Sequence, residues 1–257
     1  MRGTYRGDER SIIRQQWKDV IIPQFHKVEV EPLRYFVQHR TDMITLDVGA
    51  NKGFWAKCML DTYSVSHVYM IDASPENIVE LQNEEDSLVF FEQDFAKISA
   101  YHYALSSRKG FTTLYTNEDG SPLASLYSHN VEGIDVFGGL DKTLRVPMTS
   151  IDDFLADHAE IKRVDVLKLD VEGAEYNVLI GAHGAIANRK IDIITFEFGL
   201  HQVDARNFFR DFYFLLTNSG YRLFNISHEG TLSSVEKYEY RFENFGDQFT
   251  YVAERIV

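Results

Sequence analysis

The chain has 257 residues, of which 44% are hydrophobic, and a formal net charge of −13. This length suits one large domain with an extension, or two small domains, and the composition excludes a disordered chain. The acidic balance disfavours nucleic acid as a partner, and the single cysteine, Cys58, excludes an internal disulfide and a cysteine-based zinc site.

The N-terminal residues predict an extension to the main domain. Residues 1–40 carry mixed charge and two prolines, and they predict short helices around 9–18 and 31–39. The first ten residues are polar and lack a signal-peptide core, and no run in the chain approaches the roughly 18 apolar residues of a membrane-spanning helix. We therefore expect a cytoplasmic protein with no membrane span.

Strands and helices alternate after this extension. Residues 43–48 predict a strand that ends in a Gly-rich turn, followed by apolar residues at helical spacing. A second strand over 68–71 ends at Asp72. Ser74 and Pro75 then predict a helix start, because the hydroxyl can cap the helix and the missing N–H of proline costs nothing there.

The middle of the chain is less regular. The segment 86–95 fits a strand or a helix, and residues 101–105 predict the next strand of the sheet. From about 110 to 148 the pattern predicts an edge hairpin and a Gly-rich loop, which we interpret as an insertion or lid. Ser150 resembles the start of a capping box and predicts a short helix.

The last hundred residues return to the alternating pattern. Strands are predicted over 164–169 and 191–198, with a helix over 173–183 between them. A helix with its apolar stripe at Phe208, Phe212, Leu215 and Leu216 ends near Gly220. Strands over 221–226 and 248–253 close the chain. Residues 41–257 therefore predict an α/β domain with a mostly parallel, doubly wound sheet and a terminal antiparallel strand.

A first motif, Asp47-x-Gly49-x-Asn51-x-Gly53, lies between a predicted strand and a predicted helix. Glycines let the backbone pass close to a ligand, and ligands of such sheets bind at the carboxyl ends of the strands. Asp72 ends the next strand, where its carboxylate can accept hydrogen bonds from both ribose hydroxyls of an adenosine. The motif indicates a nucleotide-type site.

Two cofactors compete for this site. A nicotinamide dinucleotide requires G-x-G-x-x-G, whereas this chain has G-x-N-x-G with a carboxylate just before it. Asp47 would repel a pyrophosphate but suits the ammonium group of a methionine moiety. The residues therefore favour S-adenosylmethionine over NAD.

A second motif, residues 168–175, places Lys168, Asp170, Glu172 and Glu175 where a strand meets a helix start. With this motif the chain resembles the FkbM family of methyltransferases. The matching stretches are residues 46–53, 72–75, 103–110, 150–154 and 168–175, together with Glu197, and they span roughly residues 43–200.

The resemblance implies a Rossmann-like class I methyltransferase fold and transfer of a methyl group to oxygen. It implies acceptors that are hydroxyls of sugars, glycans or small natural products. The expected cofactor-binding residues come from the matching stretches: Asp47, Gly49, Asn51, Gly53, Asp72, Ala73, Ser74, Ala104, Leu105 and Asp170.

An alcohol oxygen needs a base, or a metal that lowers its pKa, before it attacks a methyl group. The expected catalytic residues are His201, Glu172, Lys168 and Asp170, with Glu197 a further candidate base. His201 has an intrinsic pKa suited to the role, although a surface loop histidine explains it as well. Lys168 could orient a carboxylate or the acceptor.

Three carboxylates at adjacent strand ends, Asp170, Glu172 and Glu197, could hold Mg²⁺ through oxygen ligands. This expectation rests on analogy with catechol-type methyltransferases of similar fold. The sequence thus leaves a metal-assisted and a base-assisted route open.

Two other functions stay open at this point, namely an NAD-type Rossmann oxidoreductase and a non-catalytic cofactor-binding partner subunit. The expected partner is a small-molecule or glycan hydroxyl acceptor, without nucleic acid. The extension over residues 1–40 is expected to cap the acceptor pocket or to contact a second copy in a homodimer.

Overall fold

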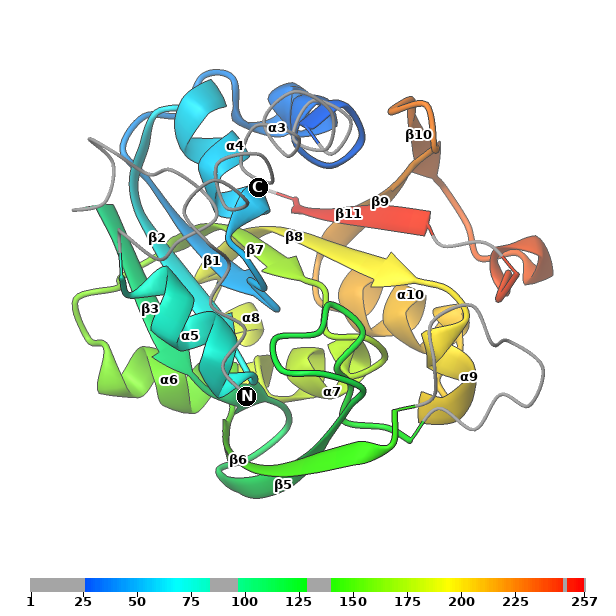
Figure 1. The fold of residues 1–257 in the computed structure, drawn as a ribbon. Helices are drawn as coiled ribbons and strands as arrows, with labels where there is room; N and C mark the ends of the chain where they lie inside the picture. Colours follow the sequence, from blue (N-terminus) through cyan, green and yellow to red (C-terminus); the bar gives the residue numbers. More distant parts are fainter. Residues whose placement is uncertain (1–25, 84–96, 129–139, 247–248, 257) are drawn as a thin grey trace.

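The computed structural model describes residues 26–83, 97–128, 140–246 and 249–256. Its centre is an eight-stranded sheet with the strand order β10-β9-β11-β8-β7-β1-β2-β3 (Figure 1). Five strands of this sheet run parallel: β1 (Met43–Val48), β2 (Val65–Asp72), β3 (Ile98–His102), β7 (Val164–Leu169) and β8 (Ile191–Phe198).

The inner parallel strands are apolar because helices cover both faces of the sheet. All six residues of β7 are buried, and only Ile44 of β1 is partly exposed. The register pairs Val48 of β1 with Ile71 of β2 and Leu169 of β7. The carboxyl ends of these three strands therefore lie together at one edge of the sheet.

The sheet ends in antiparallel strands. β11 (Phe249–Arg255) lies between β8 and β9 (Tyr221–Ile226) and is antiparallel to both. This confirms the mostly parallel sheet with a terminal antiparallel strand. A further short strand, β10 (Leu232–Val235), pairs with β9 and was not predicted, because its sequence is short and half polar.

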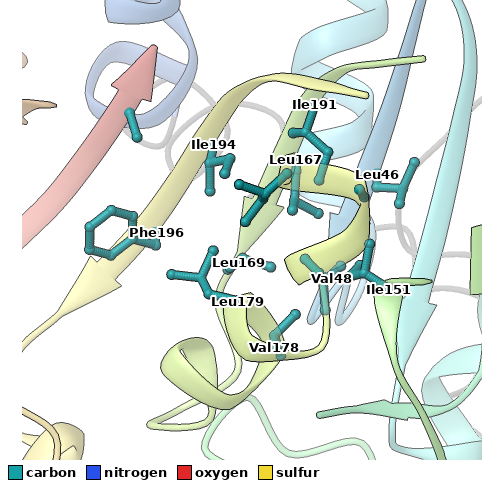
Figure 2. Packing of buried hydrophobic residues seen from close by; sticks show 14 of the residues in the cluster. Leu46, Val48, Ile151, Leu167, Leu169, Val178, Leu179, Ile191, Ile194 and Phe196 are labelled. Carbon is teal, nitrogen blue, oxygen red and sulfur yellow. The ribbon is translucent and has the colours of Figure 1, made fainter. Parts of the chain in front are cut away.

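Two layers of helices cover the sheet. One face carries η2 (His26–Val30), η3 (Glu31–Leu33), α3 (Arg34–Val37), α4 (Phe54–Thr62) and α5 (Pro75–Leu81), whose buried side chains share one core cluster. The other carries α6 (Ile151–Asp157), α7 (Glu175–Ile180), α8 (His183–Ala187) and α10 (Phe209–Asn218). Figure 2 shows side chains of β1, β7, β8 and α7 packed together in this second cluster. Burial of these apolar surfaces stabilises the three-layer arrangement.

A small second sheet has three strands in the order β4-β6-β5. β5 (Gly110–Thr116) and β6 (Lys142–Thr149) form the predicted hairpin. The expectation of one strand over residues 101–105 was wrong. The chain leaves the main sheet after β3, and β4 (Ala104–Leu105) pairs with β6 instead.

The predicted helix over 173–183 is interrupted at Gly181. A Cβ atom at this residue would lie 2.1 Å from the backbone oxygen of Ser106, so the chain approaches its neighbour too closely for a side chain. A new helix, α8, begins at His183, where both carboxylate oxygens of Asp152 accept backbone N–H groups, from Gly184 and Ala185, at 2.7 Å. The carboxylate thus caps the second helix.

The apolar stripe of α10 (Phe209–Asn218) contains the predicted Phe212 and Leu216, but it begins at Phe209 and not at Phe208. Phe208 is the extended N-cap residue and is 50% exposed, whereas Phe209, Phe212 and Leu216 are buried. The helix begins after Phe208, so the buried positions follow a spacing of three and four residues from Phe209.

Some expectations fall on residues that the structure does not describe. The helix over 9–18 and the ambiguous segment 86–95 lie outside the described residues. Within the helix predicted over 31–39, the described backbone is helical from Glu31 to Val37. No helix in the described part of the chain has the length and apolar character needed to cross a membrane.

Candidate active site

A cavity of about 280 Å³ opens at the carboxyl ends of β1, β2 and β7. This volume lies just below the range for small-molecule sites, roughly 300–1,000 Å³. Its lining includes the turn after β1, the end of β2, residues 103–105, the loop 121–126 and the loop after β7. Glu197 of β8 completes the wall.

The turn after β1 brings two strand ends into contact. Gly49 has φ +79°, and a Cβ atom there would lie 1.7 Å from the backbone oxygen of Asp170. Gly49 N–H donates to Ile71 O at 2.8 Å, and Asp170 N–H donates to Val48 O at 3.0 Å. Glycine is required here because the ends of β1 and β7 lie so close together that no side chain fits between them.

Asp72 lies on the cavity wall in a fixed orientation. Its Oδ1 accepts the Ser74 N–H at 2.8 Å and the Asn77 amide at 3.1 Å, while Oδ2 accepts the Asn51 N–H at 2.8 Å. Burial raises the pKa of this carboxyl group, and the hydrogen bonds from Ser74, Asn51 and Asn77 oppose that rise. These contacts hold a carboxylate at the cavity with capacity to accept further hydrogen bonds.

Eight of the ten residues expected to bind the cofactor line this cavity: Gly49, Asn51, Asp72, Ala73, Ser74, Ala104, Leu105 and Asp170. Gly53 does not, and instead precedes α4 with φ +82°. Ser74 occupies the predicted N-cap position of α5, although its side chain makes no capping hydrogen bond. The structure thus places most of the expected residues around one space.

Asp47 is placed differently from the expectation. Its side chain is fully buried, does not line the cavity, and lies 3.3 Å from Lys168 Nζ. The Asp47 carboxylate therefore faces Lys168 of the neighbouring strand and is not part of the cavity wall. Its expected contact with a methionine moiety stays a prediction, and the ion pair with Lys168 of β7 could not be foreseen from the sequence.

Lys168 joins the ends of β1 and β7. Its ammonium group lies 3.0 Å from Asp170 Oδ2 and donates to Gly49 O at 3.1 Å, in addition to the Asp47 contact. Burial by itself lowers the pKa of this lysine, but the attraction of Asp170 and Asp47 outweighs it, so the pKa is raised. These contacts hold Lys168 between the ends of β1 and β7, and Lys168 is not among the described residues that line the cavity.

Glu172 and His201 form a pair beside the cavity. Glu172 lines the cavity and has φ +52°, which is strained for a residue with a side chain. Its Oε2 lies 3.3 Å from His201 Nδ1. His201 is 8% exposed, does not line the cavity, and its Nε2 has no hydrogen-bond partner in the described part of the chain. The structure therefore brings the two predicted catalytic residues Glu172 and His201 into contact, with Glu172 nearer the cavity.

The loop that carries Glu172 is held from both sides. Glu175 Oε1 accepts the Val171 N–H at 2.9 Å and Oε2 accepts the Gly173 N–H at 3.0 Å. Ser125 Oγ donates to the Glu172 carbonyl at 2.7 Å. Ser125 belongs to the segment 110–148 that is interpreted as a lid, and its contact with Glu172 could not be predicted from the sequence because 47 residues separate the two.

Carboxylates are crowded at this edge of the sheet. Burial raises the pKa of Glu172 and of Glu197 well above the usual value, and Asp170 adds to both shifts. Burial also raises the pKa of Glu29, on η2, to about 6. The ammonium group of Lys168 opposes the rise in pKa of all three glutamates.

The structure does not support the expected magnesium site. The described residues contain no group of three or more His, Cys, Asp or Glu side chains placed to hold a metal ion. Asp170 faces Lys168, and Glu172 faces His201. The carboxylates Asp170, Glu172 and Glu197 are near one another but do not converge as ligands.

Comparisons with known proteins give one family and several similar folds. A family model described as the methyltransferase FkbM domain matches residues 47–223. A methyltransferase FkbM structure from Methylobacillus flagellatus is 15% identical with a TM-score of 0.48, covering 95% of this chain and 57% of that one. The chain thus spans just over half the length of that protein.

Two further solved structures are similar. A putative RNA methyltransferase from Pyrococcus horikoshii is 12% identical, with a TM-score of 0.41 and coverage of 99% of this chain and 87% of that one. A precorrin-6y C5,15-methyltransferase from Geobacter metallireducens is 9% identical, with a TM-score of 0.39 and coverage of 98% and 89%. A search of curated proteins found no match.

Proposed function

Because the chain belongs to the FkbM methyltransferase domain family, we propose that it transfers a methyl group from S-adenosylmethionine to a hydroxyl oxygen. Membership of this family supports methyltransferase activity and the use of S-adenosylmethionine. The choice of oxygen, and of a sugar, glycan or small natural product as the acceptor, is the proposed part.

The observation that supports this function is the charge of the cavity. Asp72, Asp170, Glu172 and Glu197 all line it, and no lysine or arginine is among its described lining residues. S-adenosylmethionine carries a sulfonium and an ammonium group, so it would compensate these carboxylates. A pyrophosphate would be repelled by them, which argues against the nicotinamide alternative.

The residues around the cavity fit the parts of this cofactor. Asp72 is oriented to accept hydrogen bonds from ribose hydroxyls. Ala104, Leu105 and Leu114 supply an apolar wall for the adenine, and Asp170 supplies a carboxylate for the ammonium group. When bound, S-adenosylmethionine supplies a methyl group on a positively charged sulfur.

Glu172 is suited to take the proton of the acceptor hydroxyl. It lines the cavity, and its pKa is raised by burial and by the neighbouring Asp170 and Glu175, so it is a stronger base than an exposed glutamate. His201 lies behind it and orients the carboxylate through the 3.3 Å contact. A positioned base of this kind contributes roughly 10²–10⁴-fold to the rate.

Methyl transfer from S-adenosylmethionine labelled in its methyl group tests this function. The label should pass to hydroxylated acceptors in a product that resists acid and alkali, as an ether does. Label found only in alkali-labile esters, or only on nitrogen, would contradict transfer to a hydroxyl oxygen.

A further inference from the structure

A second cavity adjoins the first one. It has a volume of about 420 Å³ and is lined by Val28, Glu29, Ile226, Ser227, His228 and Thr250, together with Glu197. Glu197 also lines the first cavity, so this residue borders both spaces. A molecule in the second cavity can therefore lie beside one in the first.

The two cavities are built from different parts of the chain. Every residue that lines the first cavity falls within residues 47–223, the segment that matches the family. Only Glu197 of the second cavity falls within that segment. The first cavity thus belongs to the shared methyltransferase domain, and the second is formed by the flanking segments of this chain.

The strand register explains how the second cavity forms. Thr250 of β11 pairs with Glu197 of β8 on one side and with Ile226 of β9 on the other. Glu29 reaches over the sheet from η2, and its Oε1 accepts the hydroxyl of Thr250 at 2.9 Å. Because β11 lies between β8 and β9, residues of these three strands form one wall of the second cavity. This wall lies next to the carboxyl ends of the parallel strands.

The lining of the second cavity is polar and contains acidic side chains. It offers two carboxylates, a serine and a threonine hydroxyl, and the ring of His228, which lies 5.2 Å from that of Phe249. The described lining contains no lysine or arginine. Carboxylates accept hydrogen bonds from hydroxyl groups and repel phosphate and carboxylate groups.

We infer that the second cavity binds the methyl acceptor, and that this acceptor is a neutral polyhydroxylated compound such as an unphosphorylated sugar. Glu29 and Glu197 accept hydrogen bonds from its hydroxyl groups, and the reactive hydroxyl extends past Glu197 into the first cavity. Glu172 and Glu197 both line that first cavity, so the reactive hydroxyl also comes within reach of Glu172.

The reaction then balances without a further reactant. The acceptor oxygen forms a bond to the methyl carbon while the carbon–sulfur bond breaks and leaves its electron pair on sulfur. The proton of the hydroxyl group passes to the carboxylate of Glu172. The products are a methyl ether and S-adenosylhomocysteine. This inference rests on the proposed function, because it requires methyl transfer to oxygen.

Saturation-transfer NMR on the full chain with S-adenosylhomocysteine bound tests the inference. The probes are methyl α-D-glucopyranoside, methyl α-D-mannopyranoside and glucose 6-phosphate. We expect signals from at least one methyl glycoside and none from the phosphate. A Val28→Trp variant, which fills the second cavity, should lose the glycoside signal. The matched control is Val79→Trp, because Val79 is 65% exposed on α5 and lines neither cavity.

Glu29→Lys is a second variant that changes the charge of the cavity without filling it. It should weaken binding of the methyl glycosides at least tenfold and allow glucose 6-phosphate to bind. Calorimetry with S-adenosylhomocysteine should give the same Kd for wild type, Val28→Trp and Glu29→Lys.

Three results would overturn the inference: no signal from either methyl glycoside, a stronger signal from the phosphate on the wild type, or a glycoside signal that survives Val28→Trp. Failure of the wild type to bind S-adenosylhomocysteine would instead contradict the proposed function.

Discussion

His201 Nδ1 lies 3.3 Å from Glu172 Oε2. The backbone of Glu172 has a positive φ. The glutamate lines the cavity, whereas the histidine lies behind it. This arrangement supports our proposal that Glu172 is the base and that His201 orients its carboxylate without contacting the acceptor.

Replacing Glu172 by Gln should therefore lower kcat by about 10²–10⁴-fold, because the proton acceptor is lost while the shape of the side chain is kept. The Kd for S-adenosylhomocysteine should change little. Single-turnover methyl transfer measures the first quantity and calorimetry the second. Glu118→Gln, an exposed glutamate on the neighbouring loop, is the matched control. Undiminished turnover in Glu172→Gln would remove this residue from the mechanism.

Asp72→Asn should weaken binding of S-adenosylhomocysteine more than tenfold. The amide keeps the size of the side chain, but its NH₂ group cannot accept the N–H of Asn51 or Ser74, nor a ribose hydroxyl. Titration calorimetry measures the Kd. The control is Asp157→Asn, whose carboxylate is 63% exposed beside Lys109. Equal affinities for Asp72→Asn and wild type would show that the ribose assignment is wrong.

Comparing Gly49→Ala with Gly220→Ala separates two effects on stability: the strain of a positive φ, and the collision of a new Cβ atom with a neighbouring strand. Both glycines have positive φ, but only Gly49 has an atom in the way, the Asp170 oxygen at 1.7 Å. Gly220→Ala should cost about 1–2 kcal/mol of unfolding free energy from strain alone. Gly49→Ala should cost at least about 3 kcal/mol and should also abolish cofactor binding. Urea unfolding measures both values, and similar costs for the two variants would contradict the contact between β1 and β7.

Glu29 makes stability depend on pH. Burial, with a contribution from Asp170, raises its pKa from 4.5 to about 6, so the folded chain holds this proton more tightly than the unfolded chain. Its contribution to stability is complete below pH 4.5 and is lost as the pH rises through about 6. Between these values the wild type should lose about 2 kcal/mol of unfolding free energy relative to Glu29→Gln.

Urea unfolding of both proteins across this pH window tests the Glu29 prediction. Asp170 and Glu197 interact electrostatically with Glu29, so the comparison with Glu29→Gln is needed to isolate one carboxyl group. Parallel stability curves for the two proteins would show that Glu29 is ionised as readily in the folded state as in the unfolded state.

Much of the fold could be predicted because the parallel strands are continuous apolar runs bounded by Gly-rich or charged turns. Residues 43–48, 164–169 and 191–198 were assigned as strands with the bounds that the structure has. The failures have tertiary causes. β10 depends on its pairing with β9, and the break at Gly181 depends on the approach of Ser106.

The candidate site could be predicted where residues follow strand ends directly. Asp72, Asp170 and Glu172 all line the cavity, as their positions in the sequence indicated. The ion pair between Asp47 and Lys168 could not be predicted, because the sequence does not show which side chains of β1 and β7 face each other. Glu29 was missed because 168 residues separate it from Glu197, its neighbour across the second cavity.

Titration calorimetry of the wild-type chain with S-adenosylmethionine, S-adenosylhomocysteine and NAD tests the central claim most directly. The carboxylate-lined cavity predicts that the first two bind and that NAD does not, and that Asp72→Asn weakens both by more than tenfold. Tight binding of NAD, with no heat from S-adenosylmethionine or S-adenosylhomocysteine, would contradict the account.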